Sequence, residues 1–165
     1  MRLLFAAFLT LSFACSADTI TGRVVAVSDG DTIKVLDSEK RQHTIRLSGI
    51  DAPEKAQPFG QRSKENLSSL VFGKTVSVEW SKHDKYGRIV GKVLMDGTDT
   101  NLEQIKAGMA WFYRRYAKEL AASDADAYER AEGLAMSQKQ GLWQSDTPVP
   151  PWDWRRKIAA DKGSK

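Results

Sequence analysis

The chain has 165 residues, 41% of them hydrophobic, which suffices for one domain with one core and hardly for two. Its 25 Lys and Arg residues against 21 Asp and Glu residues give a mild basic excess. This excess is compatible with a polyanionic partner but does not by itself indicate one. Cys15 is the single cysteine, so the chain is not a disulfide-stapled scaffold, and its stability must come from packing.

The first 17 residues are typical of a signal peptide. Arg2 precedes an apolar run over residues 3–11 that is interrupted only by Thr10, and small residues follow. The run is too short to stay as a membrane anchor, so we expect an exported, periplasmic or secreted domain that begins at Asp18. Cys15 leaves a lipoprotein alternative open, in which the acylated thiol attaches the chain to a membrane. Ser12 stands where such proteins usually have a leucine, which favours loss of Cys15 with the leader.

The first half of the mature chain has the pattern of short strands. β-Branched residues recur at period two between turn residues. The five strands predicted in this way are Thr19–Val27, Thr32–Leu36, His43–Leu47, Thr75–Trp80 and Arg88–Met95.

Three helices are predicted around these strands. Apolar residues at helical spacing mark Gly60–Val71, a capping box at Thr100 marks the second helix, and a 3.6-residue period runs from Ser123 towards Gly141. The fold class is therefore mainly β with helices (α+β). We expect a closed five-stranded barrel with three α-helices, because so few strands avoid exposed edges best by closing. An open α+β sandwich is the alternative.

The last segment, residues 145–165, forms a Pro/Trp/Arg-rich tail beyond a domain that spans residues 18–144. Three prolines over residues 148–151 argue against a long regular element here. Its tryptophans could pack on the domain or contact a ligand, and packing is favoured because exposed indole rings are costly.

Asp29 to Thr32 read Asp-Gly-Asp-Thr between two predicted strands. A turn here places one or both carboxylates at a strand end. Oxygen ligands of this kind suit calcium or magnesium rather than zinc. An ordinary Asp-Gly turn explains the same four residues.

Arg46 and the segment Asp51-Ala52-Pro53-Glu54 form a second group of polar residues. Strand alternation turns Arg46 away from its apolar neighbours, so its guanidinium need not be in the core. Pro53 fixes the chain between two carboxylates. An equally good explanation of the segment is a helix start, in which Asp51 caps a helix that has Pro53 in its first turn.

The third group is Lys85-Tyr86-Gly87-Arg88, a turn that leads into the last predicted strand. It joins a second arginine, a lysine and an aromatic ring at one loop. Taken alone, it is also explained as an ordinary basic turn.

Taken together and in this order, the three groups resemble the staphylococcal nuclease (thermonuclease) family, over about Thr21 to Trp143. The resemblance implies an OB-type barrel, a calcium cofactor, and cleavage of both DNA and RNA to leave 3′-phosphate ends. Nothing in the sequence demands a protein partner, so we expect no obligate partner and a monomer.

Metal and catalytic roles follow from this resemblance. It implies that Asp31 and Asp51 bind calcium together with the backbone carbonyl of Ala52. It makes Glu54 the candidate general base that acts on a water. A hard cation and a base are groups that promote in-line attack on a phosphodiester.

The resemblance also assigns the phosphate and substrate contacts. Arg46 would bridge the phosphate, and Arg88 would stabilise the charge that develops on the leaving oxygen. Tyr86 and Tyr116 match positions of substrate-contacting rings, and Lys85 is a candidate phosphate contact.

Two questions stay open at this point. The sequence does not say whether Tyr113 or Arg114 supplies a further substrate contact. The alternative function is a non-catalytic OB-fold module that only binds nucleic acid. The presence of every key side chain argues for catalysis.

Overall fold

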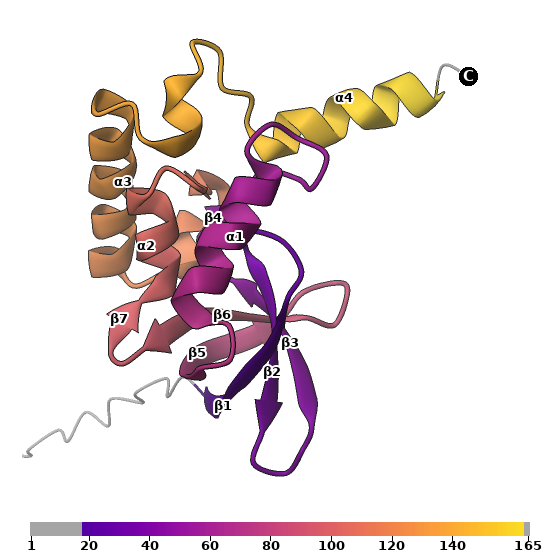
Figure 1. Cartoon of the computed structure of the whole chain (residues 1–165), viewed down its shortest axis with the longest axis vertical. Helices are drawn as coiled ribbons and strands as arrows, with labels where there is room; N and C mark the ends of the chain where they lie inside the picture. Colours follow the sequence, from indigo (N-terminus) through magenta and orange to yellow (C-terminus); the bar gives the residue numbers. More distant parts are fainter. Residues whose placement is uncertain (1–17, 164–165) are drawn as a thin grey trace, which may run out of the picture.

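The computed structural model describes residues 18–163 (Figure 1). The predicted leader and Cys15 lie outside these residues. The strands are β1 (Asp18–Val27), β2 (Thr32–Asp37), β3 (Gln42–Leu47), β4 (Ile50–Asp51), β5 (Thr75–His83), β6 (Ile89–Met95), β7 (Thr98–Asp99) and β8 (Trp111–Phe112). The helices are α1 (Gly60–Val71), α2 (Thr100–Lys106), α3 (Ala122–Ser137) and α4 (Pro151–Gly163), with short 3₁₀ turns at Arg114–Glu119 and Gly141–Gln144.

Five strands close into a barrel, as the sequence predicted. They are hydrogen-bonded in the order β3-β2-β1-β5-β6. A parallel pairing of β3 with β6, with Ile45 opposite Ile89, joins the two ends of this order. Closure removes the exposed strand edges that an open five-stranded sheet would present. The short β4 and β8 pair separately beside the barrel.

Alternation along the strands fills the barrel. In β3, Ile45 and Leu47 are buried in the core, while Arg46 between them points out of it. Leu67 and Val71 of α1 are fully buried against the same core. Each such aliphatic side chain stabilises the fold by about 1.5–3 kcal/mol. The core therefore fixes which face of β3 carries Arg46.

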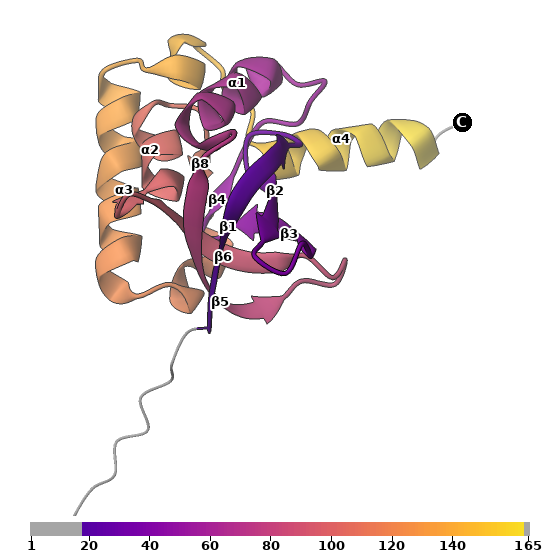
Figure 2. The same cartoon turned by 60° about the horizontal axis from the view of Figure 1, so that its bottom comes forward.

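The first three helices lie close to their predicted places, with two differences at their ends. α2 is capped by Asp99, whose side chain accepts from the backbone N–H groups of Asn101 and Leu102. The capping box predicted at Thr100 is thus wrong by one residue. α3 ends four residues before Gly141, because the chain first turns through Lys139, which has a φ of 50°. α2 and α3 pack against each other on one side of the barrel (Figure 2).

The structure contradicts the prediction that the tail forms no long regular element. Residues 151–163 form the 13-residue helix α4, which projects away from the barrel in both views (Figures 1 and 2). Proline at the first position of a helix has no N–H to lose, and Pro151 occupies that position. Pro148 and Pro150 lie in the irregular connection before it, and the Pro150 carbonyl accepts from the Trp154 N–H at 3.0 Å. Within residues 18–163, no helix has the length and apolarity needed to cross a membrane.

Candidate active site

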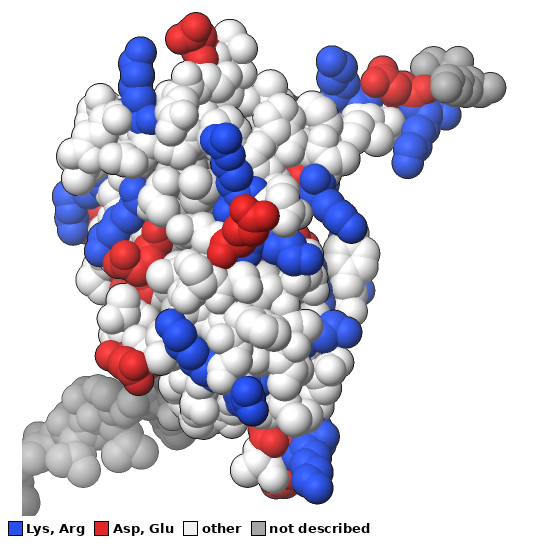
Figure 3. All heavy atoms as spheres, in the orientation of Figure 1, with Lys and Arg blue, Asp and Glu red and all other residues white. Residues whose placement is uncertain are grey.

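Every site residue predicted from the sequence lines one cleft of about 970 Å³ beside the barrel. These residues are Asp31, Arg46, Asp51, Ala52, Glu54, Lys85, Tyr86, Arg88 and Tyr116. Lys and Arg side chains are scattered over the face shown in Figure 3 and do not gather in one patch. The mild basic excess therefore does not mark a binding surface on that face, and the cleft is where the charged groups converge.

Side chains of α1 and α2 pack against the Asp-Gly-Asp-Thr turn. The Gln104 side-chain amide donates to the Gly30 carbonyl at 2.6 Å, and Asp29 Oδ1 accepts from the Asp31 N–H at 3.1 Å. A Cβ atom on Gly30 would stand 1.8 Å from Ser63 Oγ, so glycine is required by close approach. Burial, together with the charge of Asp31, raises the pKa of Asp29 to about 6. Sequence reasoning missed the supporting role of Gln104.

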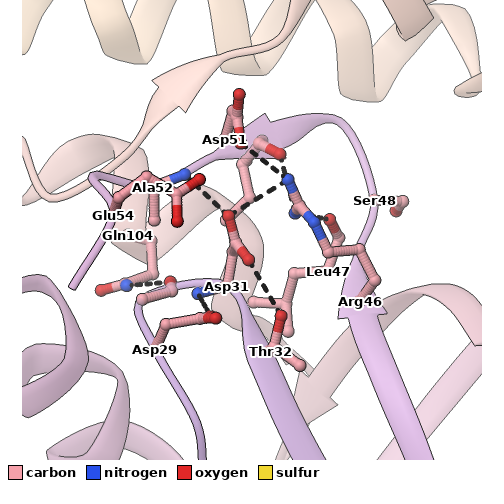
Figure 4. Close-up of polar contacts among 12 residues, drawn as sticks. Asp29, Asp31, Thr32, Arg46, Leu47, Ser48, Asp51, Ala52, Glu54 and Gln104 are labelled. Carbon is pink, nitrogen blue, oxygen red and sulfur yellow. Dashed lines mark hydrogen bonds and ion pairs between the residues drawn. The ribbon is translucent and has the colours of Figure 1, made fainter. Parts of the chain in front are cut away.

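Arg46 is fixed in place by four contacts (Figure 4). Its Nη2 lies 2.9 Å from Asp51 Oδ1 and 3.1 Å from Asp31 Oδ2. Its Nη1 donates to the carbonyls of Leu47 and Ile50 at 3.0 and 2.9 Å. Asp31 and Asp51, which come from two of the three motifs, therefore meet at one guanidinium.

Asp51 is the most buried carboxylate of this group, at 1% exposure. It belongs to β4, so it does not cap a helix, which was the alternative left open by the sequence. Burial raises the pKa of Asp51, against the hydrogen bond from Arg155 and the charge of Arg46. The Ala52 backbone N–H donates to Asp31 Oδ2 at 2.7 Å.

Glu54 lies at the edge of the cleft, with its side chain 41% exposed. Its backbone N–H donates to the Gln57 side chain at 3.1 Å. Its carboxylate is 2.7 Å from Nη1 of Arg155, which reaches in from α4. Sequence reasoning missed Arg155. The only signal was the Trp-Asp-Trp-Arg-Arg run in the tail, which could not show where the helix would lie.

Arg88 follows a tight turn, and its side chain lines the cleft. Gly87 adopts a φ of 76°, which is open to glycine, and its N–H donates to the Asp84 carbonyl at 3.0 Å. The Arg88 guanidinium lies 5.5 Å from the Tyr86 ring centroid, and Lys85 Nζ lies 5.0 Å from the same ring. Tyr86 is 72% exposed. The turn thus presents one ring and two cations together at the cleft.

Two further tyrosine rings line the cleft. Tyr113 and Tyr116 meet edge to face at 5.1 Å, and both line the cleft. Trp152 of α4 stacks on Tyr113 with centroids 5.1 Å apart and planes 7° apart, so this tryptophan packs on the domain as the sequence favoured. Arg114 instead pairs with Glu132 of α3 at 2.6 Å. Tyr113, not Arg114, is therefore the residue placed at the cleft.

The donor set fits a hard divalent cation in its chemistry. Asp31 and Asp51 are buried, and one carboxylate oxygen of each lies next to the same atom, Arg46 Nη2. Calcium and magnesium prefer oxygen ligands of this kind. Over residues 18–163, no group of three or more His, Cys, Asp or Glu side chains is arranged to hold a metal ion. Arginine side chains supply the positive charge at this point in the structure.

Comparison with known proteins gives the family. Residues 44–145 match the family model described as staphylococcal nuclease homologue. A protein of Escherichia coli described as an uncharacterized endonuclease is 46% identical over 139 residues, which cover 84% of this chain and 86% of that protein. A micrococcal nuclease of Shigella flexneri is 42% identical over 144 residues, which cover 82% of this chain and 80% of that protein. The chain therefore belongs to the staphylococcal nuclease family and is a nuclease, a hydrolase whose substrates are nucleic acids.

Proposed function

We propose that this protein is an exported, calcium-dependent endonuclease that hydrolyses DNA and RNA and leaves 3′-phosphate ends. The observation that carries the proposal is the convergence of Arg46, Arg88 and Glu54 on one cleft beside the buried pair Asp31 and Asp51. Two arginines suit a phosphate, and the carboxylates suit a cation and a base.

Asp31 and Asp51 are the residues that would hold calcium, with the carbonyl of Ala52 as a further ligand. Both carboxylates are buried and lie within reach of the same guanidinium nitrogen, which supports a shared cation site. Calcium bound there would supply fixed positive charge beside the phosphate oxygens.

The chain's own side chains would share the remaining chemistry. Arg46 would bind the phosphate oxygens through its guanidinium fork. Glu54, with its side chain 41% exposed, can reach solvent and would take the proton of an attacking water. A 3′-phosphate product requires the 5′-oxygen to leave, and Arg88 would stabilise the charge on that oxygen.

Rings and cations at the cleft would hold the polynucleotide. Tyr86 and Tyr116 are 72% and 39% exposed, so both rings offer surface that a base would contact. Stacking of a base on an aromatic ring contributes about 1–3 kcal/mol and does not depend on the sugar. Lys85 would contact a phosphate. This mode of binding supports both DNA and RNA as substrates.

The proposal that the protein is exported rests on residues 1–17 alone, which have the pattern of a signal peptide. Mass analysis of the protein purified from the producing cell gives its N-terminus. A free Asp18 supports export with loss of the leader, a lipidated Cys15 supports a membrane-attached form, and a retained Met1 contradicts both.

The central experiment digests DNA and RNA with calcium, with magnesium and with chelator, followed by mass analysis of the product ends. We expect calcium-dependent cleavage of both substrates and 3′-phosphate termini. Full activity in chelator would contradict the metal requirement, and 5′-phosphate termini would contradict the assigned leaving group. A non-catalytic module would instead bind nucleic acid in chelator and cleave nothing under any condition.

A further inference from the structure

Arg155 of α4 joins the two carboxylates to which the proposed function gives different tasks. Its Nη2 lies 2.7 Å from Asp51 Oδ2 and its Nη1 lies 2.7 Å from Glu54 Oε1. Nη1 also donates to Asp51 Oδ1 at 3.3 Å. One guanidinium thus bridges the candidate metal ligand and the candidate base, across more than 100 positions of sequence.

The helix that carries Arg155 is docked at its first turn. Trp152 stacks on Tyr113 and meets Trp111 edge to face at 5.7 Å. The Gln57 side chain donates to the Val149 carbonyl at 2.6 Å. These contacts place the start of α4 against the cleft, so the position of Arg155 is set by packing as well as by charge.

Both oxygens of Asp51 are engaged by guanidinium groups, Oδ1 by Arg46 and Oδ2 by Arg155. A cation that binds Asp51 therefore competes with one of these guanidinium groups for a carboxylate oxygen. Arg46 is only 15% exposed and is also bound to two backbone carbonyls. Arg155 is 44% exposed and its described side-chain bonds go to carboxylates alone, so Arg155 is the partner that can leave at lower cost.

We propose that Arg155 is an internal counter-ion of the active-site carboxylates, which a divalent cation displaces from Asp51 and Glu54 as it binds. This inference rests on the proposed calcium site. It links two events, because the loss of Arg155 from Asp51 also releases the carboxylate of Glu54. Glu54 then becomes free to accept a proton only in the metal-loaded protein.

Competition of this kind lowers the apparent calcium affinity to the intrinsic affinity multiplied by the fraction of molecules in which Arg155 has left the carboxylates. Hydrogen bonds between charged groups favour the paired state, and partial exposure weakens them. Arg155→Gln should therefore bind calcium roughly tenfold more tightly than the parent protein.

Calorimetric titration with calcium chloride tests this on the mature chain. The matched control is Arg156→Gln, which makes the same change of charge on the same helix at a side chain that is 79% exposed and paired with Asp153. The inference is supported if Arg155→Gln binds calcium more tightly while Arg156→Gln binds like the parent. Unchanged or weaker binding by Arg155→Gln overturns it.

Thermal unfolding gives a second readout that does not depend on activity. If Arg155 is paired only without the cation, Arg155→Gln should lower the Tm of the calcium-free protein and leave the Tm at saturating calcium unchanged. An equal loss of Tm in both conditions overturns the inference, because Arg155 would then keep its partners in the loaded state.

The two proposals fail in different ways. If the parent and both variants bind no calcium, the calcium dependence proposed for this nuclease is wrong and this inference is overturned with it. If all three bind calcium with the same affinity and cleave nucleic acid, the proposed function stands and only the displacement of Arg155 is overturned.

Discussion

Asp84 and Arg88 face each other across a tight turn, with Arg88 Nε 2.7 Å from Asp84 Oδ2. The other oxygen of Asp84 accepts from the backbone N–H groups of Tyr86 and Arg88, at 2.8 and 3.0 Å. Burial opposes the charge of this carboxylate, but the hydrogen bonds from Arg88 and Tyr86 prevail and hold the pKa of Asp84 below its ordinary value. Asp84 therefore stays ionised and fixes the direction in which Arg88 enters the cleft.

We expect Asp84→Asn to lower kcat about tenfold with little change in KM, because Arg88 loses its orientation towards the leaving oxygen. Steady-state kinetics on a short DNA substrate measure this. Asp96→Asn is the control, since Asp96 lies in another turn, with a φ of 48° that asparagine tolerates. A kcat for Asp84→Asn equal to that of the control would show that Arg88 needs no such support.

Glu54→Gln should lower kcat by about 10²- to 10⁴-fold, because the amide cannot accept the proton of the attacking water. The side chain is at the edge of the cleft, so the fold should be retained and the circular dichroism spectrum unchanged. Glu65→Gln removes a charge from the exposed face of α1 and serves as the control. Parent-like cleavage by Glu54→Gln with calcium present would rule out its role as base.

Arg46→Ala should cost stability as well as activity. Arg46 is 15% exposed and pairs with two buried carboxylates. Its removal leaves Asp31 without its described ion-pair partner and leaves Asp51 with Arg155 alone. The loss in free energy of unfolding should be about 3 kcal/mol in calcium-free protein. Arg88→Ala should cost less, since Arg88 is 30% exposed and its partner Asp84 is less buried than Asp31 and Asp51. Urea denaturation checks both variants, and equal losses would contradict the anchoring role of Arg46.

Two glycine substitutions should shift stability in opposite directions. Gly30→Ala places its Cβ 1.8 Å from Ser63 Oγ and 2.7 Å from the Ala52 Cβ, so it should destabilise by about 1–3 kcal/mol. Gly133→Ala meets nothing within 4 Å on helix α3 and should stabilise by about 0.4–1 kcal/mol. Thermal unfolding of the two variants compares them directly. A parent-like Tm for Gly30→Ala would mean that the Asp31 turn relaxes without cost.

Asp37 gives a pH dependence with a definite sign. Hydrogen bonds from His43 and from the Arg41 backbone lower the pKa of Asp37 from 3.8 to about 2. A carboxylate with a depressed pKa in the folded state contributes stability that is present above pH 3.8 and lost as the pH falls towards about 2. The difference in Tm between the parent and Asp37→Asn should therefore shrink over this interval. A difference that is constant from pH 5 to pH 2 would contradict the assignment.

Much of the barrel was readable because its signals are local. The alternation of Ile45, Arg46 and Leu47 gave both the strand and the outward face of its arginine, since side chains alternate along any strand. The turn at Lys85 to Arg88 was likewise set by neighbouring residues. The tail was misread because Pro151 was counted as a helix breaker, whereas it stands at the first helical position, where it has no hydrogen bond to lose.

The sequence by itself determined the five barrel strands, the three motifs and the kinds of side chain available for chemistry, because period and turn chemistry act over a few residues. Only the tertiary structure decided which of these groups touch. Gln104 supports Gly30 from 74 positions away, and Arg155 reaches Asp51 from 104 positions away. Contacts at such separations depend on how the elements pack around a shared core, and no local pattern contains that information.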